Sequence, residues 1–242
     1  MLGRLYDNYA VSITPKSLGS GGSWGKADNG DVHAYNAVAL SFFHKKLLKV
    51  PSVHYIDVGA NTGAFTLLAA VLPLSTVYAL EPNREVRQIL EENIARNRWT
   101  NTNFTAHVYP YAAWSAREKI GFHPMPSAHG FSRVQHSFPT GGSTSYEVQG
   151  ITLDEFVEQE MDQGPDFLKI DVEGAEKHVL DGAHNVLKGM PGILMEWWPP
   201  HCVHFGYHPQ EIDSFLKEMG YAKEQVTHTF VYYEQEATHE GE

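Results

Sequence analysis

A carboxylate near the end of a strand-like segment, residues 53–58, and glycines after it form an arrangement that suits ligand binding. Gly59 and Gly63 come directly after this segment, and glycines between a strand and a helix let a ligand approach the backbone. The spacing is G-x-x-x-G, not the G-x-G-x-x-G of dinucleotide sites, and Asp57 stands before the loop, which suits a positively charged ligand. A plain strand-to-helix turn without a ligand is the alternative.

A second carboxylate, Glu81, ends the next strand-like segment, residues 76–80. A carboxylate in this place accepts hydrogen bonds from ribose hydroxyls in nucleotide sites. Asn83 follows and can cap a helix whose apolar residues recur at helical spacing. An acid at a strand end can also be an ordinary solvated side chain. Together with the glycine loop, however, Glu81 favours a site for a ligand that contains a nucleoside.

Two more carboxylates, Asp171 and Glu173, follow a third apolar segment. Alternation buries Leu168 and Ile170 and brings both carboxylates to the carboxyl edge of the strand. There they can bind a metal ion, accept a proton or attract a cationic group. The structural alternative is that one of them caps the following helix.

Strand-like and helix-like segments alternate over most of the chain, which predicts an α/β fold with a doubly wound, mostly parallel sheet. Such sheets bind ligands at the carboxyl ends of their strands, where these carboxylates lie. Residues 123–150 have no clear period and are expected to form a functional loop or lid. The expected strands are 53–58, 76–80, 103–109, 167–171, 193–197 and 229–233, and the expected helices are 36–49, 64–72, one after Asn83, one opened by Thr152, one along 175–187, and one from His208 that stops at Gly220.

Several segments in combination resemble the FkbM-type S-adenosylmethionine-dependent methyltransferases. These segments are DVGANTGAFT (57–66), LEPN (80–83), ITLDEF (151–156), DFLKIDVEGAEKHVLDGA (166–183) and ILMEWW (193–198). The resemblance implies a Rossmann-like class I methyltransferase fold, with seven strands of which the last is antiparallel. It also implies O-methylation of hydroxyls on sugars, glycans or related natural products. We expect one domain over residues 1–242, with an N-terminal extension and helix at 1–50 and an acceptor-side insertion at 123–150.

The resemblance also assigns residues to the cofactor S-adenosylmethionine. From the methionine end to the adenine, the expected contacts are Asp57, Gly59, Asn61 and Gly63, then Glu81 at the ribose, then Pro82 and Asn83. No acid or amide follows the third strand, so the adenine amino group is expected at the backbone near Ala112.

The expected reaction is in-line attack of an acceptor hydroxyl on the sulfonium methyl group, helped by alignment, a base and nearby carboxylates. Asp171, which also counts as a cofactor contact, and Glu173 are expected near the reacting centre. Glu196 or His201 is expected on the acceptor side, and the choice of base stays open. The two prolines at 199–200 argue against a helix around His201.

We expect no metal site. An ion such as Mg²⁺ takes about six oxygen ligands, and no third acid or amide stands near Asp171 and Glu173 in the sequence. The cationic sulfonium would already balance the two carboxylates. Transfer is therefore expected to be independent of metal.

Composition narrows the class of partner. The 242 residues contain 18 Lys and Arg against 29 Asp and Glu, a net charge of −11, which disfavours nucleic acid because phosphate binding depends on basic side chains. The single cysteine, Cys202, and the lack of an apolar run long enough for a membrane span favour a cytoplasmic protein that acts on a small molecule or a glycan. A nicotinamide-dependent oxidoreductase and a non-catalytic cofactor-binding or scaffold protein are the rival interpretations.

Overall fold

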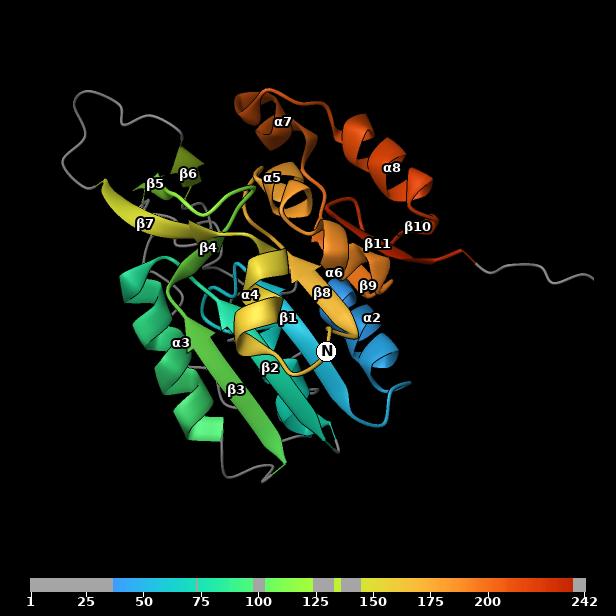
Figure 1. Cartoon of the computed structure of the whole chain (residues 1–242). Helices are drawn as coiled ribbons and strands as arrows, with labels where there is room; N and C mark the ends of the chain where they lie inside the picture. Colours follow the sequence, from blue (N-terminus) through green and yellow to red (C-terminus); the bar gives the residue numbers. More distant parts are fainter. Residues whose placement is uncertain (1–36, 73, 98–102, 124–132, 136–144, 237–242) are drawn as a thin grey trace, which may run out of the picture.

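The protein is described here by a computed structural model covering residues 37–72, 74–97, 103–123, 133–135 and 145–236. Its main sheet has seven strands in the order β10-β11-β9-β8-β1-β2-β3, shown in Figure 1. The strands are β1 (Val53–Val58), β2 (Ser75–Leu80), β3 (Phe104–Tyr109), β8 (Phe167–Ile170), β9 (Gly192–Glu196), β10 (Tyr221–Gln225) and β11 (Phe230–Gln235).

The pairing confirms the predicted mostly parallel sheet with an antiparallel last strand. The strands from β3 through β9 in this order pair in parallel, whereas β11 is antiparallel to both β9 and β10. The edge strand β10 was not expected from the sequence. Four of its five residues are exposed, so its sequence carries no apolar alternation.

Helices cover both faces of the main sheet. One core contains side chains from α2 (Ala37–Leu47), η2 (Thr66–Val71) and α3 (Arg84–Asn97). The other contains side chains from α4 (Leu153–Glu160), α5 (Glu176–Asp181), α6 (His184–Lys188) and α8 (Pro209–Glu218). Strand β1 contributes Tyr55 to the first core and Ile56 to the second, as expected for a strand buried on both sides. No helix within the described ranges is long and apolar enough to cross a membrane.

Four ends of three helices agree with the residues expected there from the sequence. The Asn83 side chain accepts hydrogen bonds from the first turn of α3, and Thr152 accepts one from the Glu155 backbone at the start of α4. Helix α8 starts after His208 with Pro209 in its first turn, and Gly220 follows its end at a φ of +89°.

Two expected helices differ from the structure, and one helix forms where none was expected. The segment 64–72 forms only the short 3-10 helix η2. The expected helix along 175–187 is split into α5 and α6, because the Asp154 carboxylate accepts the backbone N–H groups of Asn185 and Val186 and starts a new helix there. A short helix, α7 (Pro199–Cys202), followed by η3 (Val203–Phe205), occupies the region where prolines argued against one. Both prolines lie in the first turn of α7, where the missing N–H costs nothing.

A second sheet lies outside the main one, with the order β4-β7-β5-β6. In Figure 1 it lies beyond the end of β3, at the upper edge of the main sheet. Its strands are β4 (Tyr111–Ala113), β5 (Lys119–His123), β6 (Arg133–Gln135) and β7 (Tyr146–Ile151). The expectation of one long loop at 123–150 is therefore wrong for β6 and β7, while 124–132 and 136–144 lie outside the described residues. Residues 1–36 of the expected N-terminal extension also lie outside them.

Candidate functional site

Strand register brings four sequence-predicted residues to one edge of the main sheet. Val58 of β1 pairs with Leu80 of β2 and with Ile170 of β8, and Ile170 pairs with Met195 of β9. The residues that directly follow these four strand positions therefore lie at the same edge of the sheet. Gly59, Glu81, Asp171 and Glu196 are thus neighbours across four adjacent strands.

Glu81 is held by the backbone on both of its oxygens. Its Oε2 accepts a hydrogen bond from the Asn61 N–H at 2.8 Å, and its Oε1 accepts one from the Asn83 N–H at 2.7 Å. Burial raises the pKa of Glu81 to about 7, although the two backbone donors and Lys169 pull it down. Because each carboxylate oxygen has two lone pairs, both can still accept a ribose hydroxyl.

The glycine loop runs directly against the end of β8. Gly59 has a φ of +71°, and a Cβ built on it would lie 2.0 Å from the Asp171 carbonyl oxygen, so only glycine fits there. The loop is tied to α3, since the Asn93 amide donates to the Thr62 carbonyl and Gly63 packs against Leu90.

Lys169, which sequence reasoning missed, lies at the centre of this edge. Its side chain is 2% exposed, its Nζ lies 3.2 Å from Asp57 and 3.6 Å from Asp171, and it donates to the Gly59 carbonyl at 2.7 Å. Burial alone would lower the pKa of Lys169, but Asp57 and Asp171 outweigh it and raise the pKa. A lysine within the apolar segment 167–170 was the available signal, because it alternates onto the same face as Asp171.

Asp57 supports the glycine loop through buried contacts. It is 0% exposed, it is the register partner of Lys169, and its carboxylate accepts a hydrogen bond from the Thr66 hydroxyl at 2.6 Å. Asp57 therefore supports the loop through Lys169 and Thr66. Its expected contact with the methionine end of the cofactor stays a prediction.

The expected adenine contacts lie on both sides of Glu81. Asn83 is buried and caps α3, and the Pro82 carbonyl accepts a bond from Arg87. Ala112 is buried in β4, opposite Gly150 of β7. These residues stay predictions as cofactor contacts.

The loop after β8 is shaped by Glu176, not capped by Glu173. The Glu176 carboxylate accepts hydrogen bonds from the backbone N–H of Gly174 at 3.1 Å and of Val172 at 3.3 Å. Gly174 has a φ of +106°, and a Cβ on it would lie 2.8 Å from the His201 Cβ and carbonyl oxygen. This close approach brings α7 against the loop and sets His201 beside Glu173.

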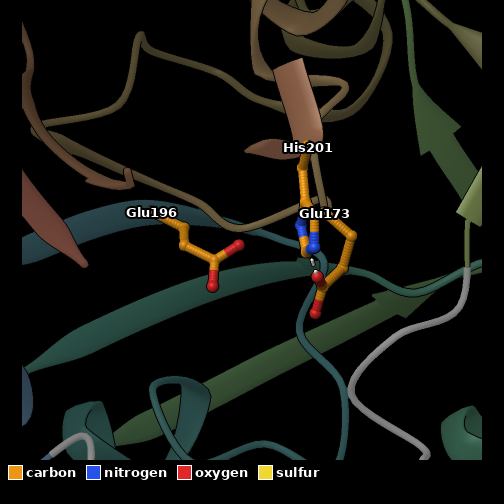
Figure 2. Close-up of side chains that lie close together, drawn as sticks. All are labelled: Glu173, Glu196 and His201. Carbon is orange, nitrogen blue, oxygen red and sulfur yellow. Dashed lines mark ion pairs between the residues drawn. The ribbon is translucent and has the colours of Figure 1, made fainter. Parts of the chain in front are cut away.

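Glu173, Glu196 and His201 form a compact cluster, which Figure 2 shows. They come from the loop after β8, the end of β9 and α7. The Nδ1 atom of His201 lies 3.1 Å from Oε2 of Glu173. The pKa of Glu196 is raised well above its ordinary value, first by burial and then by Asp171, Glu173 and Glu176. Sequence reasoning named these residues separately, and the tertiary structure brings them together.

Comparisons with known proteins bear on the family to which the chain belongs. The family model described as the methyltransferase FkbM domain matches residues 57–223. A hexuronic acid methyltransferase, AglP, from Haloferax volcanii is 31% identical over 164 residues, which are 67% of this chain and 60% of that protein. The chain thus spans less than two thirds of that relative's length.

A crystal structure of a methyltransferase FkbM from Methylobacillus flagellatus KT superposes with a TM-score of 0.52 at 19% identity. That alignment covers 79% of this chain and 46% of the other chain, and it supports the fold. With the family match over most of the described sheet and its strand-end motifs, the chain belongs to the FkbM methyltransferase family.

Proposed function

We propose that this protein is an S-adenosylmethionine-dependent O-methyltransferase that acts on a hydroxyl of a sugar or glycan, with hexuronic acids as the first acceptors to test. The observation that carries the proposal is Glu81, fixed by two backbone donors at a strand end beside the glycine loop. The sugar acceptor is suggested by the name of the Haloferax relative.

The residues at this edge fit the cofactor. Glu81 offers the two acceptor oxygens that ribose hydroxyls need, and Gly59 leaves room for close approach to the backbone. Asp171 is about one quarter exposed, and its charge suits a cationic sulfur. When bound, S-adenosylmethionine supplies a methyl group on that sulfur, while Lys169 keeps Asp171 and the loop in place.

The acceptor would lie on the side of Glu173, Glu196 and His201, and its hydroxyl proton would pass to this cluster. Trp198, 39% exposed and next to His201, is the aromatic side chain available to stack on a sugar face. Trp197 is already covered by Lys223, whose Nζ lies 3.6 Å from its ring centroid.

The second sheet lies close to both sides of this site. The Tyr146 hydroxyl of β7 accepts a hydrogen bond from the Arg84 backbone near Glu81. Val148 of β7, which lies within the insertion, belongs to one buried cluster with Trp114, Phe122 and Ala175, and Ala175 follows the loop after β8. This contact supports the proposal that the 123–150 insertion shapes the acceptor side.

The test is an assay with labelled S-adenosylmethionine and a matched panel of glucuronic acid, galacturonic acid, glucose and galactose. The expected result is release of S-adenosylhomocysteine and a product heavier by one methylene group, with the uronic acids preferred. Calorimetric titration with S-adenosylhomocysteine and with NADH separates the rivals. Binding of NADH alone would favour the oxidoreductase, and cofactor binding without transfer to any glycan would favour a scaffold.

A further inference from the structure

Three side chains of the types that bind metal ions converge from three separate elements of the fold. Glu173, Glu196 and His201 each offer one ligand atom, and these atoms all lie within 4.8 Å of one another. Figure 2 shows the Glu196 carboxylate beside the Glu173–His201 pair. The set contains one imidazole nitrogen and two carboxylate oxygens.

The distances suit a shared ion. Ligand nitrogen and oxygen atoms lie about 2.0–2.2 Å from a divalent transition metal, so neighbouring ligands are about 2.8–3.6 Å apart in octahedral or tetrahedral sites. The distance of 3.1 Å between His201 Nδ1 and Glu173 Oε2 falls in this range. The wider separation within the set, up to 4.8 Å, would have to shorten on metal binding, and rotation of a glutamate side chain is the motion that would do this.

Charge around the set also favours a cation. The Oε2 atom of Glu196 is buried and has no hydrogen-bond partner among the described residues. Asp171, Glu173 and Glu176 add like charge around it, and Lys169 is the cation that acts against them. A divalent ion would give the buried oxygen a ligand bond and offset the crowded carboxylates.

We propose that Glu173, Glu196 and His201 bind one divalent transition-metal ion of the Mn²⁺ or Zn²⁺ type. An imidazole with two carboxylates suits this class of ion better than Mg²⁺, which favours oxygen ligands alone. The expectation of no metal depended on the lack of a third ligand near Glu173 in the sequence. Folding supplies that ligand from β9 and α7, so this reason no longer holds.

Such an ion would keep positions open for oxygens of the acceptor. A hydroxyl bound to it would lose its proton more easily, as water does on zinc, and the proton would pass to the carboxylate oxygen of Glu173 or Glu196 that is not used as a ligand. Asp171 is not part of the set, so it remains available to the sulfonium. The role in transfer depends on the proposed function, but metal binding itself does not, and it is tested without cofactor or acceptor.

The test uses untagged full-length protein freed of metal with EDTA and then titrated with Mn²⁺, with free Mn²⁺ measured by electron paramagnetic resonance. One equivalent is expected to bind. Glu196→Gln and His201→Gln should each weaken binding by more than about 100-fold, beyond the usual effect of an outer-shell residue. The control Glu92→Gln removes an exposed carboxylate of α3 that is not part of the proposed metal site, and this variant should bind Mn²⁺ like the wild type.

Circular dichroism spectra establish that each variant is folded, and Glu173→Gln provides a third, independent removal of a ligand. Absorption of the Co²⁺ form should report a nitrogen ligand that His201→Gln removes. Absence of stoichiometric binding to wild-type protein would overturn the proposal. Equal binding by the wild type and the three ligand variants would overturn it as well, even if those variants lose methyl transfer.

Discussion

Two neighbouring parts of the site differ in how their charges are satisfied. The half proposed to bind the cofactor, the cofactor half, consists of Asp57, Glu81 and Lys169 with the loop 59–63, and its carboxylates are held by a lysine, a hydroxyl or backbone N–H groups. The half proposed to face the acceptor, the acceptor half, consists of Glu173, Glu196 and His201, where carboxylates crowd together and one buried oxygen has no donor among the described residues. The first half is complete as folded, whereas the second has the charge pattern of a site that gains from a bound cation.

The largest expected effect comes from breaking the cofactor half at Lys169. Lys169→Met leaves the fully buried Asp57 without its cation, and loss of one partner of a buried pair costs about 3–5 kcal/mol. Urea unfolding measures the change. The control Lys177→Met breaks a pair with Asp181 whose side chains are about one third exposed, and it should cost less than about 1 kcal/mol.

Adding Asp57→Asn to Lys169→Met should recover much of that stability, because no unpaired charge then remains buried. If Lys169→Met were as stable as the wild type, the cofactor half would not depend on its ion pair. The contrast drawn between the charges of the two halves would then be wrong.

Glu81→Ala tests the same half by ligand affinity. Loss of hydrogen bonds to a charged acceptor costs about 1.5–3 kcal/mol, which is roughly a 10–150-fold weaker Kd for S-adenosylhomocysteine. Calorimetric titration gives the value, with Glu92→Ala as the exposed control. An unchanged Kd in a folded variant would remove Glu81 from the ribose site.

The pH dependence of cofactor binding should also follow Glu81. Its pKa of about 7 means that the carboxylate, the better acceptor, is lost as the pH falls. If the charged form binds ribose, S-adenosylhomocysteine affinity should fall about tenfold between pH 8 and pH 6. Glu81→Gln should show no such dependence, and a wild-type profile equally flat would contradict the assignment.

The same shift has the opposite sign for stability. Because the pKa of Glu81 is raised on folding from about 4.5 to about 7, its contribution to stability is complete below pH 4.5. That contribution is lost as the pH rises through 7. The unfolding free energy without cofactor should therefore decline over this range in the wild type more than in Glu81→Gln.

The smallest expected effect is at Glu196. In metal-free buffer, Glu196→Gln removes one of several crowded carboxylates and should change the unfolding free energy by less than about 0.5 kcal/mol, or raise it. Urea unfolding next to Lys169→Met makes the contrast direct. A loss above about 2 kcal/mol would mean that the acceptor half is as completely paired as the cofactor half.

The amino-acid sequence by itself determined the parallel α/β architecture and the residues at the strand ends. Buried parallel strands appear in the sequence as continuous apolar runs, and Gly59, Glu81 and Asp171 directly follow three such runs. The local sequence pattern was therefore sufficient to place these residues at strand ends. The caps at Asn83 and Thr152 were equally local. The edge strand β10 and all four strands of the second sheet were missed. Strands β4 and β6 have only three residues each and β10 is mostly exposed, so they show little periodicity.

Only the tertiary structure decided which charges meet. Lys169 pairs with Asp57, 112 positions away in the sequence, because the register of β1 and β8 sets them side by side. The periodicity of a sequence does not reveal how two strands are aligned. Likewise, Glu196 and His201 reach Glu173 only because β9 lies beside β8 and Gly174 lets α7 approach the loop. The sequence determines which chemical groups stand at strand ends, but strand order and close backbone packing determine which groups become partners.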